Sequence, residues 1–353
     1  MQANLNLLSR EDRLCLTLKS LYASYGYREY RLSGFDEYSL YADNSNFFGS
    51  GEVISFSADG KLLALRPDVT LGIAKNGRFG AGTHKIFYCE KVLRKSAGAF
   101  KEVSQIGVEI IGDADFACEA ELCALMLKTL SATGGQYVLD VSHTGIVNKV
   151  LSALNLSSAD SAFALGCLES KNAHDFSRFS AERGLDKKAV RAFESLIAFN
   201  GGNLSSVTDK ISPVADVTKE CKELTSLISL YGGSLRADFS VTGDAAYYNG
   251  VIFKGYINGV PCAVLSGGRY DKLLKKFGKD QRAMGFALYL GELYARSDAG
   301  RSAEAVVIYN DGNFASALSY ADGLRQMGAS VLTAKEIPEN FSGKVYYAEK
   351  KDD

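Results

Sequence analysis

The chain has almost no net charge and no long apolar run. Its 353 residues carry 40 lysines and arginines against 41 aspartates and glutamates, which gives a formal net charge of -1 at pH 7. Such a balance provides no bulk attraction to nucleic acid or to an anionic membrane. No apolar segment approaches the roughly 20 residues that cross a bilayer, and the first residues lack the basic and apolar regions of a signal peptide. We therefore expect a cytoplasmic protein that has neither a membrane nor a nucleic acid as partner.

Cysteine and histidine are too sparse to support a metal or redox site. The seven cysteines include no CxxC pair, and the closest two, Cys118 and Cys123, have no histidine near them in the sequence. The three histidines give Ser-His-Asp chemistry little support. We expect reduced cysteines, no bound metal and no cofactor.

What is present is the composition of an ordinary globular protein. Hydrophobic residues make up 46% of the chain and charged residues 23%, and the length allows two or three domains with a large buried core. The residue patterns predict an α+β core over residues 1–302, an all-helical insertion at about 145–230, and a short α/β unit over 303–353.

Hydrophobic periodicity predicts where the elements lie. Helices are expected at 10–26, from Pro67 onward and at 116–132, with about four or five more in the insertion. Strands are expected in a hairpin over 53–65 that turns at Asp59-Gly60, and at 137–141, 235–240, 247–257, 260–265 and 283–290. Because the strands cluster as hairpins, we predict one antiparallel sheet of about six strands, flanked by helices.

Polar side chains gather on one further predicted hairpin, residues 85–112. Arg94 closes its first strand, and Glu102, Gln105 and Glu109 lie on or beside its second. Gln105 and Glu109 are four residues apart, so in a strand they share one face. An arginine, carboxylates and an amide on one face predict a pocket for a small zwitterion. A solvated hairpin face with cross-strand ion pairs is an equal alternative on this stretch alone.

Five segments stand out in a fixed order along the chain. They are ALRPDVT (64–70), VLRKSAGAFKEVSQIGVEIIG (92–112), AAYYNGVIFKGYI (245–257), SGGRYDKLL (266–274) and MGFALYLGEL (284–293). Together they resemble the catalytic core of class II aminoacyl-tRNA synthetases in its histidyl form. Five ordered motifs are far more specific than any one of them alone. The resemblance covers roughly residues 5–300 and implies the class II fold, an antiparallel sheet flanked by helices.

The resemblance implies a set of histidine-binding residues. Arg94 matches the motif arginine that binds the ATP α-phosphate and the amino-acid carboxylate region. Glu102 matches an acidic residue of the same motif, although the usual Arg-Glu-Phe reads Lys-Glu-Val here. The full implied set comprises positions for the amino group, the imidazole and the ring walls: Asp68, Thr70, Arg94, Gln105, Glu109, Tyr248 and Tyr270. Carboxylates and an amide for the ammonium, with tyrosines around the imidazole, suit histidine.

Several departures from the synthetase pattern fall on the adenylation chemistry. Gly243 stands where a histidyl enzyme has an arginine, and Glu292 stands where the third class II motif has the arginine that clamps the ATP γ-phosphate. The first motif lacks its proline near Ser33, and the C-terminal unit is too short for a complete anticodon-binding domain. Adenylation requires cationic stabilisation of charge at phosphorus, so we expect no catalytic residues.

A histidyl core with an amino-acid pocket but without those arginines resembles the regulatory subunits of ATP phosphoribosyltransferase. The resemblance implies a role in the first step of histidine biosynthesis, with the short form of the catalytic subunit as partner. It also implies that L-histidine binds for feedback inhibition and that the chain forms a homodimer within a hetero-oligomer.

Two other functions stay open. One is a divergent histidyl-tRNA synthetase or related adenylating ligase, and the other is a synthetase-like binding module for another small molecule or RNA. Two minor signals have structural interpretations: His143 as a histidine at a strand end, and Gly267-Gly268 as part of a strand-to-helix turn.

Overall fold

A computed structural model describes residues 8–44, 53–96, 99–243, 247–294, 303–339 and 341–347, without the side chains of Arg94, Ser96 and Tyr294. The chain folds into two compact units. One comprises residues 17–293, and the other combines 294–353 with 1–16.

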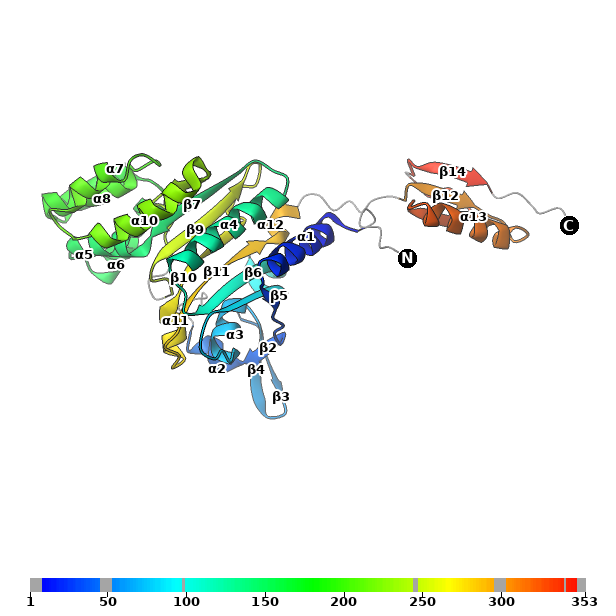
Figure 1. Ribbon diagram of the computed structural model, residues 1–353, viewed down its shortest axis with the longest axis horizontal. Coiled ribbons are helices and arrows are strands. Elements are labelled where there is room, and N and C mark those ends of the chain that lie inside the picture. The colour runs from blue at the N-terminus through cyan, green and yellow to red at the C-terminus, as the bar shows by residue number, and fades with distance from the viewer. Residues whose placement is uncertain are drawn as a thin grey trace. The chain divides into compact units, whose positions relative to one another are not determined.

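The larger unit is built on an eight-stranded sheet (Figure 1). The strand order is β1 (Arg28–Glu29), β5 (His84–Ser96), β6 (Ala99–Gly112), β11 (Arg282–Tyr289), β10 (Leu265–Arg269), β9 (Val251–Ile257), β7 (Tyr137–His143) and β8 (Leu235–Ala237). The six central strands pair antiparallel, as the sequence predicts. The edge strands β1 and β8 pair parallel with their neighbours.

Two long helices cover one face of this sheet, α1 (Arg10–Ser24) and α4 (Phe116–Ala132) (Figure 1). Tyr22 of α1 joins them to the strands. Its ring lies 6.0 Å from that of Phe87 and 6.1 Å from that of Phe286, and its hydroxyl lies 3.0 Å from the Thr129 hydroxyl of α4. All these groups are buried, so this face is closed by packing.

The opposite face carries α3 (Val69–Asn76) and α11 (Asp271–Lys276). Leucines and isoleucines of these helices form one buried cluster with the β5–β6 hairpin: Leu71, Ile73, Leu273, Leu274, Ile86 and Ile111. Because side chains alternate along a strand, positions 105, 107 and 109 of β6 face this side, while Val108 faces α1 and α4. Gln105 and Glu109 therefore lie on the face of the sheet that carries α3.

A small second sheet lies in the same unit, in the order β2 (Phe35–Glu37), β4 (Lys61–Leu65) and β3 (Ser55–Ala58), with the short helix α2 (Tyr38–Ala42). Its β3–β4 turn is the predicted Asp59-Gly60, with φ of 49° and 73°. Two successive positive φ values are what a type I′ hairpin turn requires, so this prediction is confirmed.

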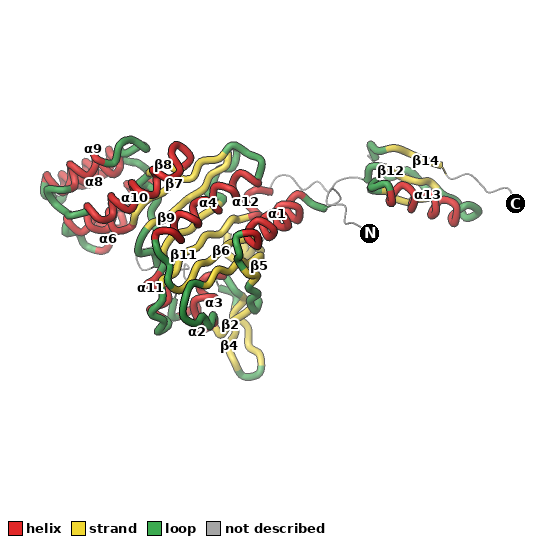
Figure 2. The backbone as a smooth tube through the Cα atoms, in the orientation of Figure 1, coloured by secondary structure: helices red, strands yellow, loops and turns green. Residues whose placement is uncertain are grey.

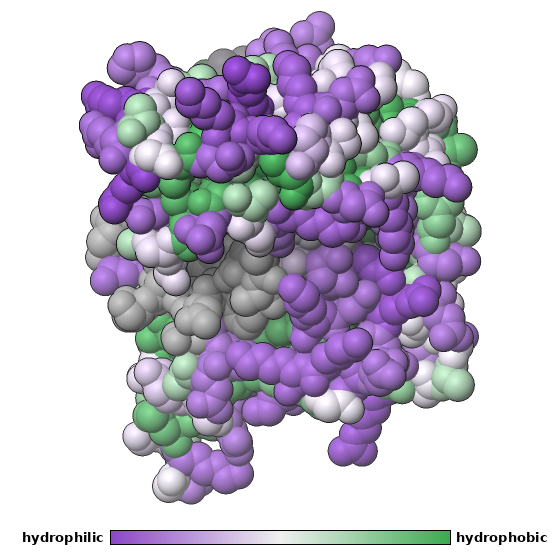
Figure 3. Space-filling model, turned by 90° about the vertical axis from the view of Figure 1, so that its left-hand side faces the viewer, coloured by the Kyte–Doolittle hydropathy of each residue, from purple (hydrophilic) through white to green (hydrophobic). Residues whose placement is uncertain are grey.

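Residues 144–231 form six α-helices, whereas the sequence predicts four or five (Figure 2). They are α5 (Thr144–Ala153), α6 (Ser158–Glu169), α7 (Ala173–Glu182), α8 (Lys187–Ile197), α9 (Ser205–Ile211) and α10 (Thr218–Tyr231). The sequence predicts too few helices because α9 is only seven residues long. It buries just Val207 and Ile211, which are too few to show a helical period. Figure 3 views the molecule from the side on which these helices lie in Figure 1, and hydrophilic side chains dominate the face that it shows.

The strand that returns after Asn258-Gly259 begins later than the sequence predicts. We expected it at 260–265, whereas β10 covers Leu265–Arg269. Pro261 has no N–H to donate to a ladder, and pairing resumes where the Val264 N–H donates to the Gly255 carbonyl. Gly267 and Gly268 consequently lie inside a strand, and their assignment to a turn was wrong.

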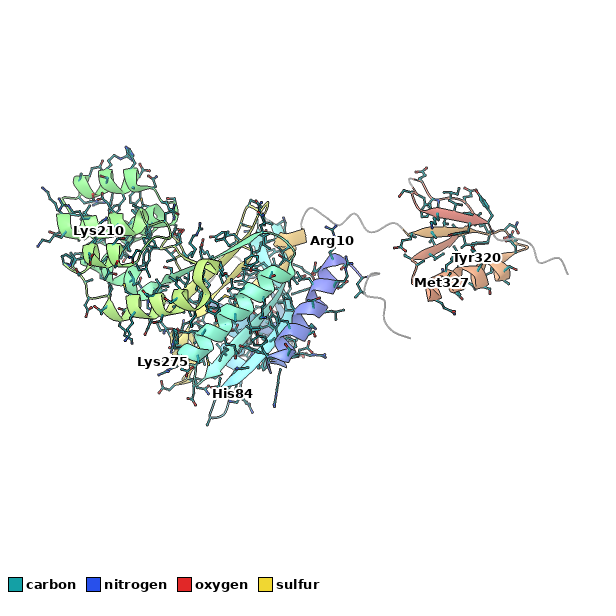
Figure 4. The ribbon with its side chains drawn as sticks, turned by 45° about the horizontal axis from the view of Figure 1, so that its top comes forward. Arg10, His84, Lys210, Lys275, Tyr320 and Met327 are labelled. Atoms are coloured by element: carbon teal, nitrogen blue, oxygen red, sulfur yellow. The ribbon has the colours of Figure 1, made fainter. Side chains whose placement is uncertain are left out.

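The smaller unit has the predicted strand–helix–strand pattern followed by a last strand. Its parallel sheet has the order β13 (Val331–Ala334), β12 (Ala305–Ile308) and β14 (Lys344–Tyr347). Helix α13 (Phe314–Gln326) packs Ala317 and Ala321 on Val307. Tyr320 and Met327, which Figure 4 labels, are 48% and 77% exposed. Helix α12 (Leu290–Tyr294) lies at the end of the larger unit.

Candidate functional site

The site centres on the carboxylate of Glu109, which is buried in the middle of the large sheet. The β6 register places Glu109 between Ile86 of β5 and Gly285 of β11. The side chain is 1% exposed. Thr70 donates its hydroxyl hydrogen to Oε1 at 2.9 Å, and Tyr270 donates to Oε2 at 2.6 Å. Three segments that are distant in the sequence thus meet at one carboxyl group.

Glycine on the neighbouring strand makes room for this carboxylate. A Cβ atom at position 285 would overlap Glu109 Oε2 and the Val108 carbonyl. The Glu109 side chain therefore extends across β11 towards β10, where the Tyr270 hydroxyl meets it. Gly285 is what allows a long polar side chain to lie flat on the sheet.

Burial dominates the electrostatics of Glu109. Loss of water raises the pKa of this carboxyl to about 8, the hydroxyls of Tyr270 and Thr70 oppose that rise, and the charge of Asp68 adds to it. Among the described residues, Glu109 has no cationic partner within ion-pair distance. A carboxyl group in this setting stabilises a cation brought from outside.

Gln105 supplies a second buried acceptor on the same strand face. It lies four residues before Glu109 on β6 and is 2% exposed. Its Oε1 atom is buried and has no hydrogen-bond partner within the described part of the chain. A buried acceptor without a hydrogen bond costs folding free energy. A hydrogen-bond donor of a bound molecule would therefore be stabilised by Gln105.

Helix α3 places its first residues over these acceptors. Asp68 is its N-cap, with extended backbone, and its carboxylate accepts the Leu71 N–H at 2.8 Å. This cap fixes where the helix begins, and Thr70 in its first turn lies against Glu109. Asp68 therefore has a structural role in addition to the ligand role that the resemblance implies.

Tyrosines form the remaining walls. The Tyr247 ring lies 4.5 Å from that of Tyr248 and 5.6 Å from that of Tyr270. A Cβ at Gly268 would come within 2.9 Å of Tyr248, and one at Gly107 within 2.6 Å of the Tyr88 hydroxyl. Both tyrosines thus lie directly on the glycines of the sheet floor.

Tyr88 and Tyr247 line this site but are absent from the set predicted from the sequence. Burial first, then the charges of Glu109 and Asp68, raise the pKa of both phenols, so both stay neutral. Strand alternation could have found Tyr88, because it shares a face of β5 with Glu90, the residue that pairs with Gln105. Tyr247 gave no comparable signal, since only the tertiary fold distinguishes it from its neighbour.

The described residues hold no group of three or more metal-ligating side chains, and none of their helices has the length and apolarity to cross a membrane. The site as described therefore consists of acceptors, hydroxyls and aromatic rings.

The profile of the histidyl-tRNA synthetase family matches residues 6–293. The chain belongs to the histidyl-tRNA synthetase family. The sequence also resembles ATP phosphoribosyltransferase regulatory subunits. One such protein, from Caldanaerobacter subterraneus subsp. tengcongensis, is 29% identical over 289 residues, which cover 76% of this chain and 74% of that protein.

Solved structures show the same class II synthetase fold. An ATP phosphoribosyltransferase regulatory subunit/histidyl-tRNA synthetase from Bacillus halodurans aligns with a TM-score of 0.78 at 23% identity, covering 99% of this chain and 96% of that one. A chain of the HisG:HisZ complex of ATP phosphoribosyl transferase from Thermotoga maritima aligns with a TM-score of 0.62 at 16% identity, covering 78% and 96%. The predicted α+β architecture is therefore confirmed.

Two other polar residues of the hairpin, Arg94 and Glu102, lie away from the Glu109 carboxylate. The backbone of Arg94 pairs with Lys101, eight residues along β5 from the partner of Glu109, which is about 26 Å of strand. Its side chain lies outside the described part. Glu102 forms an exposed ion pair with Lys91 at 2.9 Å, so for this residue the surface alternative was right.

The positions that the resemblance assigns to adenylation and to the first motif have the following surroundings. Gly243 faces Tyr248, whose Cδ2 would lie 2.6 Å from an added Cβ. Glu292 is exposed on α12 and accepts a hydrogen bond from the Cys262 thiol at 3.2 Å. The Ser33 carbonyl accepts a hydrogen bond from Arg66, a buried side chain that pairs with Glu90 at 2.7 Å.

His143 has the structural role predicted from the sequence. It is the N-cap of α5: its Nδ1 accepts the Gly145 N–H at 3.0 Å, while Nε2 lies 3.2 Å from a carboxylate oxygen of Glu223. Burial lowers the pKa of this imidazole despite the opposing effect of Glu223. A neutral ring is required, because only unprotonated Nδ1 can accept the capping hydrogen bond.

Proposed function

We propose that this chain is a non-catalytic regulatory subunit of ATP phosphoribosyltransferase that binds L-histidine. It activates the short form of the catalytic subunit and carries histidine feedback inhibition in the first step of histidine biosynthesis. The observation that carries this proposal is the buried Glu109 carboxyl, which has no cationic partner among the described residues, beside the unpartnered Gln105 acceptor.

These acceptors match the chemistry of histidine. The ligand brings an ammonium with three donors and an imidazole N–H. Glu109, Gln105 and Asp68 supply acceptors, and Tyr248 and Tyr270 supply ring walls and a hydroxyl. In the proposal Thr70 orients Glu109, while Arg94, near the hairpin end, is kept in the set on its motif match alone. The complete proposed set is Asp68, Thr70, Arg94, Gln105, Glu109, Tyr248 and Tyr270.

In this proposal, the residues at two positions are the reason why the chain does not adenylate histidine. Gly243 and Glu292 take the places of arginines that contact ATP in the synthetases. A carboxylate in place of a cation repels polyphosphate, by on the order of several kcal/mol at low effective dielectric. A pocket that keeps its amino-acid contacts and loses these cations binds its ligand without activating it.

The partner assignment is supported by the names of similar proteins. The Caldanaerobacter relative is named as the regulatory subunit, and the Thermotoga structure is a complex with HisG. We propose a cytoplasmic hetero-oligomer in which this chain forms a homodimer. Histidine regulates it by binding the active and inhibited assemblies with different affinity, as any allosteric ligand must.

Glu109→Ala is expected to abolish histidine binding while the fold is retained. The matched control is Glu102→Ala, because Glu102 lies on the same strand but makes an exposed ion pair, which contributes about 0–1 kcal/mol. Isothermal titration with L-histidine, with circular dichroism of both variants, measures the difference. Equal affinity of the two variants would place the ligand elsewhere.

Two assays separate the alternatives. Mixing the chain with a short catalytic subunit should raise its phosphoribosyltransferase rate, and added histidine should lower it again. Robust ATP–pyrophosphate exchange with histidine would instead show an adenylating ligase. The absence of heat at millimolar histidine would favour a binding module for another small molecule or RNA.

A further inference from the structure

We propose that the empty site holds a proton on Glu109 and releases it to solvent when the ammonium of histidine binds. Histidine sensing is then coupled to pH. This inference rests on the proposed function and concerns the regulation of the same pocket.

The surroundings of Glu109 contain acids and phenols in place of a counter-ion. The titratable side chains that influence it come from α3 (Asp68), β5 (Tyr88), the segment before β9 (Tyr247), the end of β10 (Tyr270) and the segment after α1 (Tyr27). From β11 only the backbone of Gly285 faces it. Of the described groups, none supplies positive charge to the carboxyl, and Asp68 adds negative charge.

A neutral carboxyl fits the observed contacts. The pKa of about 8 leaves Glu109 mostly protonated at pH 7. The hydroxyl of Thr70, 2.9 Å away, can accept as well as donate, so its contact survives protonation. Tyr270 continues to donate to the other oxygen. Without a ligand, the site thus avoids an unpaired buried charge, whose cost is large.

The ammonium of bound histidine reverses the preference of Glu109 for its neutral form. A cation in contact with the carboxyl favours the ionised form and lowers its pKa. The proton leaves Glu109 for bulk solvent, the ligand ammonium keeps all three of its own protons, and the charges balance within the pocket. Because binding releases a proton, histidine affinity rises by about tenfold per pH unit below the pKa of the empty site and levels off above it. We therefore expect weaker histidine binding in more acidic solution.

The test is calorimetric titration of the full-length chain with L-histidine at pH 7.0, 7.5 and 8.0, in buffers that differ in ionisation enthalpy. The dependence of the observed heat on that enthalpy counts protons. We expect release of close to one proton per histidine at pH 7 and about half at pH 8, given the pKa of about 8.

Two variants identify the source of the proton. Glu109→Gln, if it still binds, should release close to one proton fewer than the wild type at pH 7, because the ligand's own groups titrate alike with both proteins. Thr70→Val keeps the carboxyl but removes a hydroxyl that lowers its pKa, so the pH at which release is half-complete should move upward. If Glu109→Gln no longer binds histidine, the half-release pH of Thr70→Val shows whether the proton comes from Glu109.

The outcomes are distinguishable. Histidine binding without proton release at pH 7, or a half-release pH that is unchanged in Thr70→Val, overturns this inference and leaves the proposed function standing. A complete absence of histidine binding removes the proposed function and the inference with it.

Discussion

Glu109 shows how one residue acquires its chemistry from burial. An exposed glutamate is ionised at neutral pH, whereas this one is 1% exposed, contacts two hydroxyls and has a pKa raised to about 8. The group carries a cost in the unliganded protein, because a carboxyl that stays neutral in the fold but ionises in the unfolded chain favours unfolding as the pH rises. Such a cost is typical of functional sites.

The first residue-scale prediction concerns stability. The folded pKa of Glu109, about 8, lies above its ordinary value of 4.5. The stability that protonated Glu109 contributes is thus present in full below the ordinary value and is lost as the pH rises through the folded value. Between pH 5 and 8, the wild type should lose about 1.4 kcal/mol per pH unit relative to Glu109→Gln.

Urea unfolding of both proteins at pH 5, 6.5 and 8 measures this difference, since all other titrating groups cancel in the comparison. A difference that stays constant across the series would show that Glu109 is ionised in the fold.

At the scale of elements, the site depends on how closely three strands approach one another. Gly107 of β6, Gly285 of β11 and Gly268 of β10 form a floor on which Tyr88, Glu109 and Tyr248 rest. Strand propensity alone disfavours glycine. Its presence in three adjacent strands is explained by backbone carbonyls of the neighbouring strands and by side chains that occupy the space where a Cβ would be.

Gly285→Ala is the element-scale prediction. The new methyl group overlaps Glu109 Oε2 and the Val108 carbonyl, so a strand or the carboxylate must shift. We expect destabilisation of roughly 1–3 kcal/mol. We also expect a larger loss of histidine affinity than in Gly166→Ala, the control variant described next.

Gly166→Ala in α6 is the matched control. Gly166 is exposed, lies within a helix and has nothing within 4 Å of an added Cβ, so this change should stabilise the protein by about 0.5–1 kcal/mol. Thermal melting and histidine titration of both variants test the pair. A neutral Gly285→Ala would mean that the sheet floor tolerates a side chain.

For the whole molecule, the sheet and the described site residues belong to one compact unit. Residues 17–293 contain the eight-stranded sheet, α3 and the tyrosines, whereas the β12–β14 sheet has its own small core around Val307. Units with their own cores fold and act with partial independence.

Truncation after Tyr294 tests that independence. The shortened chain should bind histidine with an affinity within about twofold of the full-length value, because every residue of the proposed set belongs to the larger unit. Calorimetry and circular dichroism of the two chains give the comparison. A large loss of affinity with an intact fold would show that the C-terminal unit takes part in binding.

Local patterns in the sequence determined much of this protein. The hairpin at 85–112, the common face of Gln105 and Glu109, and the Asp59-Gly60 turn follow from strand alternation and turn chemistry, which act over a few residues. The family motifs also pointed to Thr70 and Tyr270. Strand ends were less certain: Pro261 displaced the return strand, and the short helix α9 gave no period of its own.

Only the tertiary structure decided which carboxylate of the hairpin is buried. Thr70 and Tyr270 reach Glu109 across 39 and 161 residues of sequence, because the sheet order sets β6, β11 and β10 side by side. The same order buries Glu109 and leaves Glu102 in a surface ion pair. Burial is the property that changes a carboxyl's pKa, and it depends on contacts between distant segments that no local pattern records.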